Sequence, residues 1–183
     1  MMIRGNRFNI YFAVVLGLGL VSGCRTTESK REKQISVLHL HIEANPDPTK
    51  HTEQVFIGRE HLASINAQKE PFLTEANIKE AKVIDVMGGF AISLQLDRQG
   101  SWLLEEYTGA NPAKHLAIFC QWAMSPQEKV NEGRWLAAPK ITKRITDGSL
   151  IFTPDATREE AEQIVLGIDN VARQIDKEVT NRW

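Results

Sequence analysis

Two histidines and a glutamate alternate along one short segment of the chain, at His39, His41 and Glu43. Side chains at alternate positions of a β-strand lie on one face, and imidazole and carboxylate groups are common zinc ligands. A closed structural zinc site generally needs four ligands, and the nearest further histidines, His51 and His61, have no cysteine near them. We therefore interpret the three residues as a solvated or half-covered strand face. The alternative to this interpretation is that the protein is a small metal-dependent envelope enzyme, which uses the face of His39, His41 and Glu43.

The other reactive residue types do not form a catalytic set. Ser101, Ser125 and Ser149 lack the glycine pattern of a nucleophile elbow, and the sequence after residue 23 has no phosphate-cradling loop. The glutamate pairs at 105–106 and 159–160 fit helix surfaces, where glutamate is usually solvated. We expect no catalytic residue, no bound metal and no cofactor, and hence a protein that is not an enzyme.

The first two dozen residues resemble a bacterial lipoprotein signal. Arg4 and Arg7 precede an apolar run over 8–21, which is shorter than a bilayer-spanning helix and is followed by Ser22, Gly23 and Cys24. The resemblance implies that residues 1–23 are a signal peptide, and that Cys24 becomes the acylated first residue, with palmitate among its chains. Several acyl chains would make the protein permanently anchored to a membrane without spanning it.

Residues 24–34 comprise the lipidated cysteine and a polar stretch without apolar periodicity, which predicts a flexible tether. Arg25 stands where an aspartate would retain an enterobacterial-type lipoprotein at the inner membrane, so the periplasmic side of the outer membrane is favoured. Cys120 then has no intramolecular partner, and we interpret it as a small buried apolar residue.

Length and charge restrict the remaining part of the chain. Loss of the two arginines in 1–23 takes the formal charge from −1 to −3, which argues against nucleic acid as a partner. Residues 35–183 are long enough for one domain with its own core.

Hydrophobic periodicity predicts an α+β domain, in which helices pack on one face of a mixed or antiparallel sheet. In the first strand Leu38, Leu40 and Ile42 share a face, and the second strand is expected to pair with the first. The last helix begins after the cap Thr157. The predicted strands are 35–44, 55–57, 83–86, 90–96, 115–123, 135–138, 141–145 and 149–153; the predicted helices are 74–81, 101–108 and the long helix after Thr157.

Several stretches occur in the order and spacing of one known family. They are 72–74, 78–83, 92–97, 115–118, 138–141, 145–149 and 157–161. Together they resemble the head region of the first periplasmic domain of SecD and SecDF, over about residues 71–175. These landmarks are caps, turns and strand edges, and none of them is a catalytic group.

The resemblance implies a non-enzymatic module linked to protein export, which binds an extended polypeptide or another envelope protein. SecD proteins span the membrane several times and use the proton gradient to help pull exported chains across it. Here only a removable signal is expected, so the resemblance implies a binding module without the motor.

Overall fold

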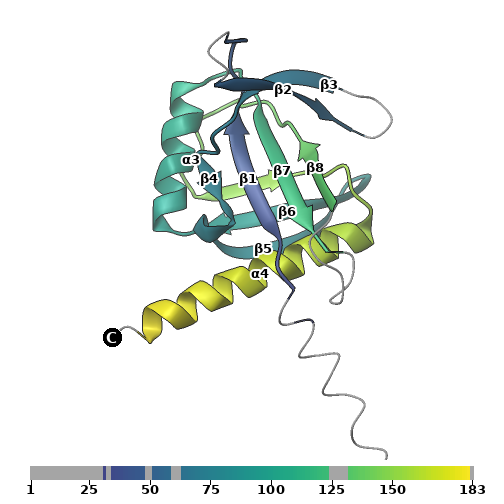
Figure 1. The fold of residues 1–183 in the computed structure, drawn as a ribbon, viewed down its shortest axis with the longest axis vertical. Coiled ribbons are helices and arrows are strands. Elements are labelled where there is room, and N and C mark those ends of the chain that lie inside the picture. The colour runs from purple at the N-terminus through teal and green to yellow at the C-terminus, as the bar shows by residue number, and fades with distance from the viewer. Residues whose placement is uncertain (1–30, 32–33, 48–50, 59–62, 124–131, 182–183) are drawn as a thin grey trace, which may run out of the picture. The chain divides into compact units, whose positions relative to one another are not determined.

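The computed structural model describes residues 31, 34–47, 51–58, 63–123 and 132–181. Lys33–Trp183 form one compact unit, and its strands belong to two sheets (Figure 1). The α+β class is therefore confirmed, although two sheets take the place of the one expected. The packed part of the chain also includes Gln34, which we placed in the tether; it is buried and donates hydrogen bonds to Ala123 O and Gln163 Oε1.

The larger sheet is mixed, with strand order β3-β2-β8-β7-β1-β4. Every pairing in it is antiparallel except the parallel contact between β2 and β8, where Ile57 faces Trp135. Its strands are β1 (Val37–Ile42), β2 (Thr52–Ile57), β3 (Ala63–Gln68), β4 (Leu73–Thr74), β7 (Leu116–Trp122) and β8 (Glu132–Ala137).

The smaller sheet is antiparallel, with strand order β5-β6-β9. β5 (Ile78–Val86) and β6 (Gly89–Leu96) form the predicted hairpin, and β9 (Ser149–Phe152) pairs with the far side of β6. Gly88 and Gly89 have positive φ angles of 87° and 158°, which the tight turn requires and which glycine adopts without strain.

The described residues of the unit also form two α-helices and one short 3-10 helix: η1 (Glu75–Asn77), α3 (Arg98–Ala110) and α4 (Arg158–Thr180). Asp97 caps α3 by accepting a hydrogen bond from Gly100 N, and Thr157 forms the predicted capping box with Glu160. The apolar stripe of α4 is buried at Ala161, Ile164 and Ile168. It becomes exposed toward the end of the helix, where Val179 keeps 54% of its surface.

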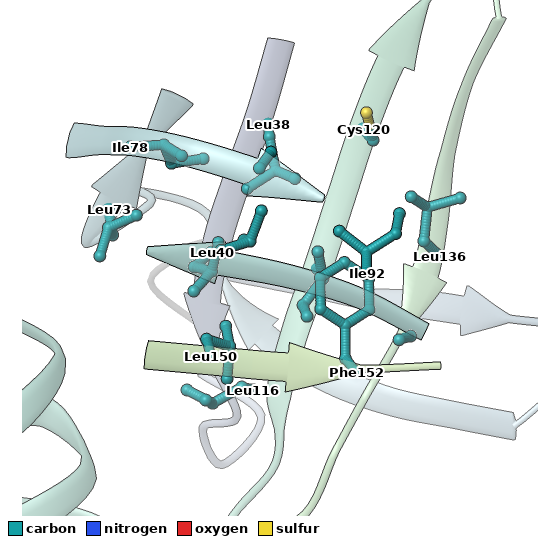
Figure 2. Close-up of a cluster of buried hydrophobic side chains, with 14 of the residues drawn as sticks. Leu38, Leu40, Leu73, Ile78, Ile92, Leu116, Cys120, Leu136, Leu150 and Phe152 are labelled. Carbon is teal, nitrogen blue, oxygen red and sulfur yellow. The ribbon is translucent and has the colours of Figure 1, made fainter. Parts of the chain in front are cut away.

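The core lies between the two sheets, and Figure 2 shows the strands of the smaller sheet crossing those of the larger one. Leu38 and Leu40 point into it from β1, and Leu150 and Phe152 from β9 (Figure 2). Cys120 is buried in the same cluster as a free cysteine, as expected. At roughly 1.5–3 kcal/mol for each fully buried large aliphatic side chain, this cluster is the main source of stability.

A second, smaller cluster lies on the other face of the larger sheet. Val55, Ile57, Ala67 and Ala117 form its buried part. The sheet curls enough for the chain after β1 to meet β3, because Glu43 bridges Ala67 and Ala44 N donates to Asn66 O at 2.9 Å. β3 thus closes back toward β1.

Two predicted elements and one predicted pairing were wrong. Residues 78–81 belong to β5 and not to a helix, and only η1 follows Thr74. β2 pairs with β3 and β8, not with β1. Residues 141–145 form no strand; the adjacent Lys140 makes a single bridge to His115. β3 was not predicted.

Candidate functional site

The predicted histidine face lies on the outer face of the larger sheet. There His39 and His41 pack with Phe119 and Trp135, and these four side chains are hereafter the ring cluster. His39 and His41 lie with ring centroids 6.0 Å apart. Phe119 contacts His39 at 6.3 Å, and Trp135 contacts His41 at 5.0 Å and Phe119 at 5.3 Å. Such centroid distances are typical of packed aromatic side chains. The face is therefore half-covered, which is one of the two states that the sequence predicted.

His41 is the most enclosed member of the ring cluster, with 5% of its surface exposed. Its Nδ1 donates a hydrogen bond of 2.7 Å to the carbonyl of Gln68 at the end of β3. Burial lowers the pKa of His41 below its usual value, although the bond to Gln68 favours the protonated ring. The ring is consequently held neutral at pH 7, with one nitrogen committed to the backbone.

Glu43 does not turn its carboxylate toward the two histidines. Its Oε2 accepts hydrogen bonds from Nδ1 and the backbone N of His115, at 2.7 and 2.9 Å. Burial alone would raise the pKa of Glu43, but the bonds from His115 outweigh it and the pKa is lowered. Glu43 therefore joins the end of β1 to the chain just before β7.

The structure thus keeps His39 and His41 adjacent but turns the Glu43 carboxylate away from them to His115. No group of three or more His, Cys, Asp or Glu side chains placed to hold a metal ion occurs among the described residues. His51 borders a shallow depression with Asp47 and Lys69, and His61 lies outside the described residues.

The other candidate residues have structural partners. Ser101 Oγ donates to the carbonyl of Asp97 within α3, at 2.7 Å. Glu105 pairs with Arg144 at 2.5 Å. Burial raises the pKa of the Cys120 thiol, which disfavours the nucleophilic thiolate. Ser125 lies outside the described residues.

Glu160 was interpreted as solvated but lies in a closely bonded site. Its Oε2 accepts from Arg134 Nη2 and from Thr157 N, each at 2.7 Å. The Arg134 guanidinium also stacks 4.8 Å from the centre of a Trp122 ring. These contacts fasten the start of α4 to the larger sheet.

Sequence reasoning could not find the sheet edges, which are the feature most relevant to binding another chain. Three of the four edge strands in the described part of the chain have cover. Asp169 Oδ1 on α4 accepts from Ala81 N on β5, Asn66 O on β3 accepts from Ala44 N, and β4 has two residues and packs against α3. β9 is the remaining edge.

One hydrogen bond shows which backbone groups of β9 face β6 and which face outward: Leu96 N donates to Gly148 O at 2.9 Å. Residues of an antiparallel pair alternately face toward and away from the partner, so Leu150 also bonds β6, while Ser149 and Ile151 turn their backbone groups outward. The Ser149 N–H is taken by Asp147 Oδ1 at 3.1 Å. The side chain of Ile151 is 54% exposed.

Comparison with known proteins now identifies the fold. Residues 52–172 match the family model described as SecDF, P1 head subdomain. The chain belongs to this family. The P1 head match includes both sheets apart from β1, and most of α4.

A curated relative of this P1 head is the protein translocase subunit SecDF of Thermus thermophilus, 34% identical over 97 residues. The match covers 52% of this chain and 12% of that protein, so the chain spans a small part of its relative.

Two solved structures share the fold. One, described as a membrane component SecDF that enhances protein export, has a TM-score of 0.52 at 22% identity and covers 93% of this chain and 72% of that chain. The other, SecDF in a super-membrane-facing form, has a TM-score of 0.53 at 24% identity and covers 83% and 21% respectively.

The predicted lipidation site Cys24 lies outside the described residues, so it stays a prediction. Within the described residues, no helix combines the length and the apolar character needed to cross a bilayer.

Proposed function

We propose that this protein is a lipid-anchored lipoprotein of the cell envelope, whose P1 head binds extended polypeptide in connection with protein export. The observation that carries the proposal is the match of residues 52–172 to the SecDF P1 head. The relative's name, a protein translocase subunit, and the description of a solved SecDF as enhancing export support the link to export.

The anchor in this proposal is the acylated Cys24, with residues 1–23 removed as the signal peptide. Lipid then holds the head at a membrane surface, and Arg25 favours the periplasmic side of the outer membrane over the inner membrane. The partners are the membrane and a polypeptide or envelope protein, and nucleic acid is not among them. The support is the run from Leu20 to Cys24.

The proposal assigns the head a binding role without catalysis. Binding an extended chain requires exposed backbone and apolar side chains, and no titrating nucleophile. The pairing of Glu43 with His115 favours this role over the metal-dependent alternative, because it occupies the carboxylate that a metal on this face would need.

The test is co-isolation with an arrested export intermediate in the native host. A secreted reporter fused to a tightly folding domain stalls during export and leaves an extended segment in the envelope. We expect the affinity-tagged full chain to co-purify with this reporter after crosslinking. It should not co-purify with the same reporter lacking its signal sequence. Equal recovery of both reporters, or recovery of neither, would contradict the proposal.

A further inference from the structure

The smaller sheet ends in a strand that is fixed on one side and unpaired on the other. Leu150 and Phe152 are each 4% exposed and anchor β9 in the core, while β6 bonds its inner edge. An edge strand held in this way already has the geometry that a further strand requires. Binding of a further strand therefore costs the protein little conformational entropy.

We propose that the outer edge of β9, hereafter the β9 edge (Ser149–Phe152), receives an extended polypeptide segment as an added strand. This inference rests on the proposed function, since it assigns polypeptide binding to one place on the head. Backbone groups spaced along an edge strand are complementary to another extended backbone, which is the basis of β-augmentation.

The backbone groups that would bind the segment can be named. Ser149 C=O and the N–H and C=O of Ile151 point away from β6, and no described residue hydrogen-bonds them. An added strand would exchange two bonds with Ile151 and donate one to Ser149 C=O. Asp147 already holds the Ser149 N–H, so it marks one end of the site.

The side chains of the β9 edge indicate the class of segment. Residues 149–153 carry no charge, whereas natural sheet edges are usually protected by lysine or other charged residues. Ile151 stands on the outer face beside Ser93, and a residue placed opposite it would contact its apolar side chain. The fitting partner is therefore an unfolded segment with uncharged, β-branched residues at alternate positions. With so few bonds, its binding is weak and reversible.

The experiment measures fluorescence anisotropy of a labelled peptide with the full chain purified in detergent. The probe is an eight-residue peptide of alternating threonine and valine, with a lysine at each end. Ile151→Lys adds charge to the edge, and Ile151→Pro removes the outward N–H without breaking a bond to β6. The matched control is Phe56→Lys on β2, because Phe56 is also 54% exposed but does not belong to the β9 edge.

We expect the wild type and Phe56→Lys to bind equally, and both Ile151 variants to bind at least about tenfold more weakly. The same peptide with methylated backbone nitrogens should not bind. Thermal melting checks each variant, and Ile151→Lys, which alters only an exposed side chain, carries the test if Ile151→Pro fails to fold.

The two proposals fail in different ways. If the wild type binds the peptide but both Ile151 variants bind it equally well, the β9 edge is not the site while polypeptide binding stands. A second probe is an unfolded protein, reduced and carboxymethylated α-lactalbumin. If the wild type binds neither this protein nor the peptide, both proposals are wrong. Sedimentation that shows a dimer dissolved by Ile151→Lys would instead assign the edge to a second copy of the chain.

Discussion

Replacing Glu160 with alanine should lower the free energy of unfolding by about 3 kcal/mol. The first contribution is the capping bond from Thr157 N to Glu160 Oε2, at 2.7 Å, whose loss costs about 1 kcal/mol. The second contribution is the ion pair between Glu160 and Arg134. The Arg134 side chain is 24% exposed and the Glu160 side chain is 10% exposed.

Breaking a buried ion pair costs about 3–5 kcal/mol, because the remaining charge is left without a partner. Arg134 is partly exposed and keeps its hydrogen bond to Asp155 O at 2.9 Å, so the cost here is lower, about 2 kcal/mol. Glu160→Gln retains an acceptor for Thr157 N, so it should cost roughly half as much as alanine.

The assay is urea and thermal unfolding of the full chain, followed by tryptophan fluorescence and circular dichroism. At about 2–4 °C per kcal/mol for a domain of this size, Glu160→Ala should melt about 6–12 °C below the wild type. Glu162→Ala is the matched control, since Glu162 is exposed on the same helix and should change stability by less than about 0.5 kcal/mol. Equal melting of the two alanine variants would refute the reasoning.

Three further predictions concern the core, the ring cluster and the anchor. Ile168→Asp should unfold the domain, because an unpaired buried charge costs several kcal/mol of a total of about 5–15, whereas Val179→Asp on the exposed end of α4 should leave thermal melting unchanged. His41 has a lowered folded pKa, so the unfolded chain binds more protons and stability should fall as pH drops below about 6.5. In His41→Asn, which can still donate to Gln68, urea unfolding at pH 5 and 7 should show a smaller difference than in the wild type. Mass spectrometry should find acyl chains on an N-terminal Cys24 and none in Cys24→Ser; a wild type without them would refute the anchor.

Local patterns were sufficient where neighbours in sequence decide the structure. Alternation placed Leu38 and Leu40 in the core, the two glycines at 88–89 made the hairpin turn, and Thr157 with Glu160 began α4. In each case the signal is physical and short-range: a face, a positive φ angle or a capping bond. These elements position most of the core.

Residues 78–81, the second half of the helix predicted over 74–81, show how a local pattern can mislead. Ile78 and Ala81 are three residues apart and both buried, as on one face of a helix. In the structure both residues lie in β5. They share a face because the pairing of β5 with β6 shifts between Ile78 and Glu80. Such a bulge adds one residue to one strand, so residues three apart come to face the same side.

The β9 edge and the contacts of His41 depend on which strands become neighbours. The parallel contact of β2 with β8 pairs Ile57 with Trp135. No sequence pattern close to either residue predicts this pairing. β3 pairs with β2, and the curl of the sheet brings the Gln68 carbonyl at its end to His41 Nδ1. A sheet edge is likewise defined by every other pairing in its sheet, so a single sequence does not reveal it.

The most direct test of the account places a photo-crosslinking amino acid at Ile151 of the full chain in living cells that contain the arrested export intermediate. The same amino acid at Phe56 is the control, since the two side chains are equally exposed at 54%. The account predicts a crosslink to the exported reporter from position 151 and little or none from position 56. Equal crosslinking from both positions, or none from position 151, would contradict it.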